Sequence, residues 1–188
     1  MDIYRELFLM QQTYGTLFSL ANKIQMRGDK FLELLTSRQY MAMIAIAHLP
    51  EDETTLNNIA RKLGTTKQSV KQLITIMENK GFVHVVPSKK DKRAINVKIT
   101  QTGKEVLLVV SEKGIFFLEK LFNKLSTEEL ETMWNLLKKL YSFDGEEQDG
   151  FEEDGHLQMD EDHSELQMKV MKEFEKRRIQ TINKRNKM

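Results

Sequence analysis

The chain has 188 residues and a formal net charge of only +1, because 29 lysines and arginines oppose 28 aspartates and glutamates. It contains no cysteine, which excludes structural disulfides, cysteine-ligated zinc and thiol redox chemistry. The first residues, MDIYRELF, carry acids where a signal peptide carries bases, and the longest apolar run, YMAMIAIAHL, is too short to cross a bilayer, so we expect a soluble cytoplasmic protein with no membrane partner.

The first predicted element is a helix over residues 3–24. Apolar residues recur there at alternating steps of four and three, which is the spacing of a coiled-coil seam. The seam consists of Ile3, Leu7, Met10, Tyr14, Leu17, Ala21 and Ile24. So much apolar surface on one helix needs a cover, which is either the core of the chain itself or a second subunit.

Three further helices are expected before the middle of the chain. The first covers residues 36–49 and ends at Pro50 and the acidic EDE. A short helix over residues 55–64 follows, with Asn57 as its N-cap and Gly64 as its end. Thr66 caps a longer helix that runs to about Lys80 and stops at Gly81. Two helices separated by a tight glycine turn are typical of a helix-turn-helix.

The helix over residues 66–80 is predicted to have two distinct faces, because its residues advance by about 100° each. One sector is apolar and carries Val70, Leu73, Ile74 and Met77. The candidate DNA-reading residues lie on the other side, at Thr66, Lys67, Gln68, Lys71 and Gln72. Glutamine can pair with adenine and lysine with guanine in the major groove, and a helix N-terminus favours phosphate. An ordinary solvent-exposed helix carries the same residue types. Only the neighbouring elements of the sequence can therefore distinguish a DNA-reading face from an ordinary one.

A basic β-hairpin is predicted next, from the strands FVHVV and AINVKI. The second strand alternates, with Ile95, Val97 and Ile99 on one face and Asn96 and Lys98 on the other. Pro87 ends the first strand, and the tip between the strands carries Lys89, Lys90, Asp91, Lys92 and Arg93. Residues 54–104 hold 11 basic residues against two acidic ones, which indicates a polyanionic partner or a solvated lysine-rich face.

Two more helices are expected after the hairpin. The first begins after Gly103 and runs to about Leu125. Ser126 and Glu129 fit a capping box that opens the second. Its apolar side carries Leu130, Met133, Trp134, Leu137, Leu140 and Tyr141.

The last part of the chain consists of an acidic segment followed by a basic one. Residues 144–165 hold 11 acids and no lysine or arginine and are predicted to form a flexible linker. Residues 166–188 are basic and predicted to be helical. Three interpretations of this tail stay open: a mobile solubilising appendage, an extra contact to DNA phosphates, or a clamp in which the acidic linker covers basic surface. The basic residues of the second interpretation are Lys176, Arg177, Arg178, Lys184 and Arg185.

We expect no metal, no cofactor and no catalysis. His156 and His163 lie near Asp160 and Asp162, but an acidic linker collects such residues by composition alone. The chain has no serine or cysteine nucleophile motif, no glycine-rich phosphate loop and no HExxH motif.

The run from Leu56 to Gly103 resembles the winged helix-turn-helix of MarR-type bacterial transcription regulators. The most specific part is the Asp-x-Arg at residues 91–93, ten residues after Gly81 and followed by KITQTG. The other matching positions are Leu56, Ala60, Leu63, Gly64, Val70, Leu73, Phe82, Val83 and Pro87. With the flanking helices, the resemblance covers residues 1–143.

The resemblance implies a mainly α fold with a small β-hairpin wing and a helical dimerisation layer. Residues 1–35 and 104–143 would form that layer in a homodimer, and residues 36–103 the DNA-binding lobe. The dimer contacts would include Ile3, Leu7, Met10, Tyr14, Leu121, Trp134 and Leu137.

The resemblance also implies how DNA is bound. The helix over residues 66–80 would enter a major groove of double-stranded DNA, and Arg93 would reach toward a minor groove with Asp91 shaping the loop. Two-fold symmetry then predicts an inverted-repeat operator. Family members are often repressors released by a small aromatic or amphiphilic effector bound between the dimer layer and the DNA lobe. Val85 departs from the pattern, since many members have a basic residue there. The rival hypothesis is a winged-helix module for protein contacts or ligand sensing without a DNA role.

Overall fold

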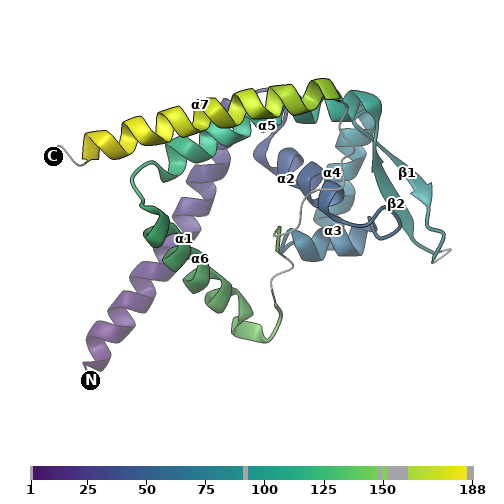
Figure 1. Cartoon of the computed structure of the whole chain (residues 1–188). Coiled ribbons are helices and arrows are strands. Elements are labelled where there is room, and N and C mark those ends of the chain that lie inside the picture. The colour runs from purple at the N-terminus through teal and green to yellow at the C-terminus, as the bar shows by residue number, and fades with distance from the viewer. Residues whose placement is uncertain (1, 91–92, 148–149, 152–160, 186–188) are drawn as a thin grey trace.

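The computed structural model describes residues 2–90, 93–147, 150–151 and 161–185 of the chain, and in residues 161–167 and 183–185 only the backbone. The described residues form a mainly helical fold with one antiparallel hairpin, as predicted (Figure 1). The elements are α1 (Ile3–Leu32), α2 (Ser37–His48), α3 (Leu56–Lys62), α4 (Lys67–Asn79), β1 (Val83–Pro87), β2 (Ile95–Ile99), α5 (Gln101–Phe122), α6 (Thr127–Tyr141), the short 3-10 helix η1 (Ser142–Asp144) and α7 (Glu161–Arg185).

Helices α2, α3 and α4 pack together with the hairpin to form a winged-helix lobe at one end of the molecule. The lobe encloses a continuous apolar core, whose fully buried side chains include Met43, Ile59, Val70, Met77 and Val97. Long α1 leaves this lobe and projects away from it, so that the N-terminus lies far from the hairpin (Figure 1). Among the described residues, no helix combines the length and hydropathy that a bilayer crossing requires.

The two short helices of the lobe end as predicted, but one begins differently. Gly64 and Gly81 follow α3 and α4 with φ angles of 58° and 73°, a left-handed conformation that glycine adopts without steric cost. Thr66 is the N-cap of α4, as predicted. The prediction of Asn57 as the N-cap of α3 was wrong. Thr55 has the extended backbone of a cap, and its hydroxyl accepts a hydrogen bond from the Asn58 amide at 3.3 Å.

The hairpin has a partial third strand that the sequence pattern did not indicate. Strands β1 and β2 pair in register from Val83 opposite Ile99 to Pro87 opposite Ile95. On its other edge β2 is bridged by Thr55, and the Val97 amide donates to the Thr54 carbonyl at 3.0 Å. Asn96 is only 4% exposed, so the face of β2 that carries Asn96 and Lys98 is covered at this position, which the alternation alone did not indicate.

Helix α5 begins at Gln101, three residues earlier than predicted, because Thr100 caps it. The Thr100 hydroxyl accepts from the Gly103 amide at 2.9 Å and donates to the Gly81 carbonyl at 2.6 Å. Gly103 lies so close to the preceding turn that a Cβ there would come within 2.0 Å of the Phe82 carbonyl oxygen. The base of the hairpin, the end of α4 and the start of α5 are thus joined at one point. The predicted capping box of Ser126 and Glu129 at the start of α6 is confirmed.

Helix α7 packs along α5 (Figure 1), an arrangement that favours a docked helix over a mobile appendage for this part of the chain. Val170 is buried against it. Arg178 donates to the carbonyl oxygens of Phe122 and Leu125 at 3.1 and 2.5 Å, at the C-terminal end of α5. The Arg177 guanidinium lies 4.1 Å from the centre of the Phe116 ring. Helix α7 begins at Glu161, within the stretch expected to be linker.

Candidate nucleic-acid interface

The outer face of α4 is polar and solvent-exposed. Lys67, Gln68, Lys71 and Gln72 are all exposed, whereas Val70, Ile74 and Met77 on the opposite face are buried in the lobe. The second helix of the helix-turn-helix therefore presents long hydrogen-bonding side chains to solvent along its first two turns.

The N-terminus of α4 is fixed by its cap. Thr66 is exposed, and its hydroxyl accepts from the Ser69 amide at 3.1 Å and donates to the Ser69 hydroxyl at 3.0 Å. Because the hydroxyl already satisfies the helix end, Thr66 sets where α4 starts and so where Lys67 and Gln68 lie.

The hairpin, here called the wing, is hydrogen-bonded to the C-terminal end of α4. The Phe82 amide donates to the Met77 carbonyl at 3.0 Å. The Val85 amide donates to Glu78 Oε1 at 3.2 Å, so the backbone at the foot of the wing contacts a carboxylate of α4. Sequence reasoning singled out the side chain of Val85 and missed this anchoring role of Glu78. These hydrogen bonds attach the wing to the helix that carries the polar face.

The predicted wing residues divide into three groups. Lys89 and Arg93 are exposed at the tip. Asp91 and Lys92 lie outside the described residues, so the proposed strut of Asp91 stays a prediction. Lys90 turns back onto the lobe, where its Nζ lies 2.8 Å from Asp52 Oδ2 and 2.9 Å from Glu53 Oε1.

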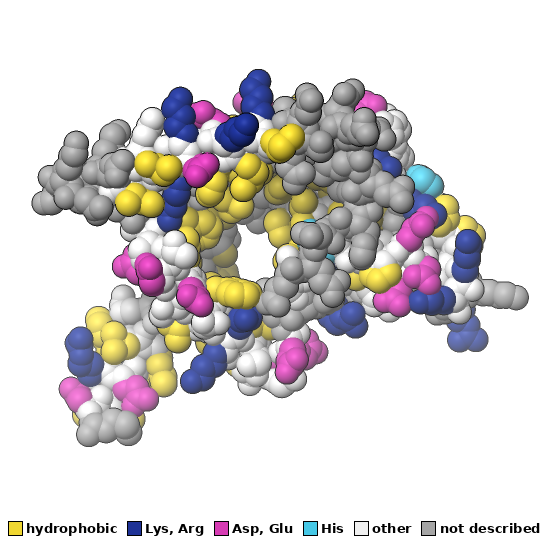
Figure 2. Space-filling model, in the orientation of Figure 1, with side chains coloured by type: hydrophobic (Ala, Val, Ile, Leu, Met, Phe, Trp, Pro, Cys, Tyr) yellow, Lys and Arg dark blue, Asp and Glu magenta, His cyan; other side chains and the backbone are white. Residues whose placement is uncertain are grey.

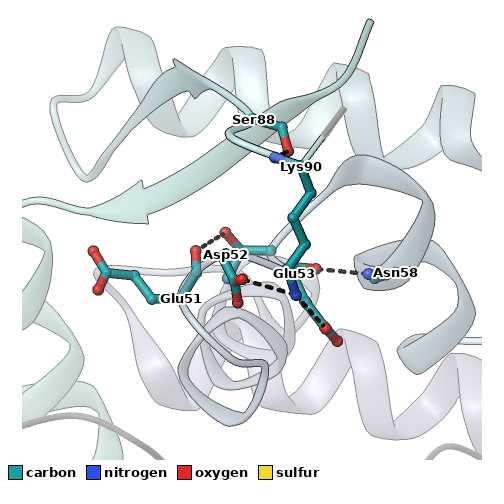
Figure 3. Close-up of polar contacts among 7 residues, drawn as sticks. Glu51, Asp52, Glu53, Asn58, Ser88 and Lys90 are labelled. Atoms are coloured by element: carbon teal, nitrogen blue, oxygen red, sulfur yellow. Dashed lines mark hydrogen bonds and ion pairs between the residues drawn. The ribbon is translucent and has the colours of Figure 1, made fainter. Parts of the chain in front are cut away.

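An acidic loop, Glu51–Glu53, faces the basic wing (Figure 3). Figure 3 shows Lys90 reaching between Asp52 and Glu53, while the Asn58 side-chain amide holds the Glu53 carbonyl at 2.8 Å. Glu51 forms a second ion pair with Lys98 of β2. Hydrogen bonding to Lys98 lowers the pKa of Glu51, hydrogen bonding to Lys90 lowers the pKa of Asp52, and hydrogen bonding to Asp52 raises the pKa of Lys90.

Sequence reasoning treated the acidic loop only as the end of a helix. The available signal was the run of three acids at residues 51–53. It directly precedes residues 54–104, which hold 11 basic and two acidic residues. The pairing of Thr54 and Thr55 with β2 is what brings the two charges together. The wing therefore presents less free positive charge than its sequence suggests.

The residues predicted to form a dimer layer lie on exposed apolar faces. Ile3, Leu7, Met10 and Tyr14 of α1 are between 54% and 73% exposed. None of the residues of α6, all of them described, is buried. Trp134 and Leu137 are exposed there, and Leu121 of α5 is half-buried. Figure 2 shows hydrophobic side chains along α1 and around an opening between α1, α6 and the winged-helix lobe.

The histidine cluster of the linker falls where the structure describes little. His156 and Asp160 lie outside the described residues, and for Asp162 and His163 only the backbone of α7 is described. Within the described part of the chain, no group of three or more histidines and acids is placed to hold a metal ion.

Comparison with known proteins agrees with the winged-helix fold of the lobe. Residues 35–94 match the MarR family model. The chain is 30% identical over 132 residues to the transcriptional regulator HosA of Escherichia coli, a match that covers 70% of this chain and 96% of HosA. The chain belongs to the MarR family. Its members named here are transcription regulators rather than enzymes.

The chain is also similar to two further transcription-related proteins, one of them solved with DNA. The solved MepR–DNA complex of S. aureus is 27% identical, with a TM-score of 0.61, and the match covers 69% of this chain and 96% of MepR. The activatory protein BadR of Rhodopseudomonas palustris is 28% identical over 110 residues, which cover 57% of this chain and 63% of BadR. The matches to HosA and MepR are thus longer than residues 35–94, which the family model covers.

Proposed function

We propose that the chain is a cytoplasmic homodimer that binds an inverted-repeat operator in duplex DNA and represses transcription until a small aromatic or amphiphilic effector releases it. The observation that carries this proposal is the exposed Lys and Gln face of α4 beside a wing that is hydrogen-bonded to the same helix. A protruding helix of about this size fits the major groove, where such side chains distinguish base pairs.

The wing supports a contact to the DNA backbone. Lys89 and Arg93 are exposed at its tip, next to an α4 whose polar face points into solvent. Phosphate contacts of this kind add affinity without reading sequence. MepR was solved in complex with DNA, and this supports duplex DNA as the partner of the similar helix and wing in this chain.

The exposed apolar faces support the homodimer. An isolated helix with the exposed seam of α1, and a helix such as α6 without any buried residue, leave apolar area in water that a second subunit can cover. Two lobes related by a two-fold axis would read two half-sites about one helical turn apart or a multiple of it.

A selection of genomic DNA fragments by the full-length protein, followed by gel shifts at two salt concentrations, tests the proposal. We expect a fragment with an inverted repeat, bound far more weakly when the salt is raised. A module for protein contacts alone would select no fragment and would show the same weak binding to every duplex. A reporter gene behind the selected fragment distinguishes repression from the activation that the name of BadR describes.

A further inference from the structure

We propose that a groove between α1 and α5 is a binding site for an amphiphilic organic anion, such as a medium-chain carboxylate. All residues that line this groove belong to α1 and α5. It is therefore separate from the space between the dimer layer and the DNA lobe, where the family resemblance places an effector. The site goes beyond the function proposed above and does not depend on it.

The groove has an apolar floor and the size of a small-molecule site. Helix α1 packs against α5 (Figure 1), and the rings of Phe31 and Phe117 lie 5.6 Å apart with an interplanar angle of 45°. The volume of the groove is about 510 Å³, within the range of ligand sites. Leu20, Ile24 and Leu121 complete its apolar lining. An occupant with an apolar body would therefore gain free energy by leaving water.

All other residues that line the groove are cationic. They are Lys23, Arg27, Lys30 and Lys120, and each of them is exposed. The three cations of α1 follow one another at steps of four and three residues, so they form a single ridge along that helix. Lys120 stands on α5, and its Nζ lies 5.9 Å from the centre of the Phe31 ring of α1. The positive charge is thus contributed by both helices, and no described acid lines the groove.

These four cations have no acidic partner among the described residues. Close by, Lys113 of α5 is paired with Glu33, with 2.6 Å between Nζ and Oε2, so the same two helices do neutralise other charges. Four like charges around one groove repel one another, and apolar walls concentrate their field on whatever lies between them. Charge complementarity therefore favours an anionic occupant, and the floor favours one with an apolar body.

A second subunit is the competing occupant. Leu121 is the only lining residue among the predicted dimer contacts, and the predicted contacts of α1 end at Tyr14. The groove begins six residues later, at Leu20. Most of it thus lies outside the predicted dimer contacts, which favours a small anion over a second subunit.

The chemistry of the site is tested by displacement of a bound probe. The probe is the fluorescent anionic amphiphile anilinonaphthalene sulfonate, bound to the full-length protein. We expect octanoate to displace it, and acetate and octanol at the same concentration to displace little, because acetate lacks the apolar body and octanol lacks the charge. Failure of octanoate to displace the probe would overturn the proposal. Displacement by octanol or by acetate that equals the displacement by octanoate would do the same.

The position of the site is tested by a pair of variants with the same loss of charge. Arg27→Gln with Lys120→Gln removes one cation of the groove from each helix. Arg38→Gln with Lys172→Gln is the matched control, because Arg38 lines the groove between α1 and the lobe and Lys172 lies on α7. We expect the first variant to bind octanoate about fivefold to tenfold more weakly, as for the loss of two partly exposed ion pairs, and the control to match the natural protein. An unchanged affinity in the first variant, or an equal loss in the control, would overturn the assignment.

Analytical ultracentrifugation of the same variants separates the small anion from a second subunit. We expect Arg27→Gln with Lys120→Gln to sediment like the natural protein. Dissociation of this variant alone would assign the groove to the second subunit and overturn the proposal. Thermal melting checks folding, and Lys23→Gln with Lys30→Gln takes the place of the first variant if that variant does not fold. No DNA is present in these assays, so their failure is distinguishable from a failure of DNA binding.

Discussion

At the scale of single residues, the acidic loop Glu51–Glu53 changes how the wing is understood. Lys90 and Lys98 are already engaged by carboxylates of the same chain. Exposed ion pairs of this kind add little to folding stability, because water screens the two charges. Their larger effect is to lower the positive potential of the wing, which weakens binding to DNA of any sequence.

Neutralising the loop should therefore strengthen binding that does not depend on sequence. We expect the double variant Asp52→Asn, Glu53→Gln to bind random duplex more tightly, with a salt dependence steeper by about one unit, as for one added phosphate contact. Gel shifts over a salt series measure both. Glu131→Gln, an exposed acid on α6, is the control and should change neither. An unchanged salt slope in the double variant would mean that Lys90 does not reach DNA.

The same ion pair has a defined pH window. The lowered pKa of Asp52 means that its contribution is complete above the ordinary aspartate value of 3.8 and is lost as the pH falls through the lower value of the folded protein. The raised pKa of Lys90 means that its contribution is complete below the ordinary lysine value of 10.5 and is lost above the raised one. The effect of Asp52→Asn on the melting temperature should therefore be constant between about pH 5 and pH 9. A difference that varies across that range would contradict the assignment.

At the scale of elements, local sequence cues predicted most of the lobe. A capping residue or a turn glycine acts on backbone groups only a few residues away in the sequence. Thr66, Ser126, Gly64 and Gly81 could therefore be recognised from the sequence alone. Thr55 and Thr100 were missed because competing signals lay two or three residues away, at Asn57 and Gly103. The third-strand pairing at Asn96 depends on residues forty positions apart, which no local pattern contains.

The candidate interface was predictable to a similar extent. The period of α4 separated its buried from its exposed residues correctly, since one helix has only one way to face its core. The engagement of Lys90 by the acidic loop joins segments that are far apart in the sequence, and the anchoring by Glu78 joins α4 to the wing. Charge and composition alone left the tail with three interpretations, and its packing along α5 disfavours the mobile appendage.

Helix α7 should stabilise the fold through Arg178. Its guanidinium donates to the carbonyl oxygens of Phe122, the last residue of α5, and of Leu125, three residues beyond it. Arg178→Ala should lower the free energy of unfolding by about 1.5–3 kcal/mol, the usual range for hydrogen bonds to a charged group. Thermal or urea unfolding measures this, with Lys172→Ala, an exposed residue of α7, as the control. Equal stability of the two variants would show that the arginine does not cap α5 in solution.

At the scale of the whole molecule, the proposed homodimer would bury the apolar faces of α1 and α6. Leu7 and Leu137 lie on these faces and are 54% and 42% exposed in the single chain. Leu7→Glu and Leu137→Glu should each yield a monomer in analytical ultracentrifugation, because an unpaired charge cannot be buried in an apolar interface without a large cost. Leu34→Glu changes a 50% exposed leucine outside these helices and should leave the dimer intact. Retention of the dimer by both helix variants would remove α1 and α6 from the interface.

The central claim, that the polar face of α4 reads sequence while the wing supplies affinity, is tested most directly by one comparison. The natural protein, Gln68→Ala and Lys89→Ala are titrated in parallel with a selected operator and with random duplex. Gln68→Ala should lose about 1–3 kcal/mol on the operator and little on random DNA, as expected for a paired base contact. Lys89→Ala should weaken binding to both duplexes by a similar factor. Equal losses on the two duplexes for both variants would contradict the assignment of α4 as the recognition helix.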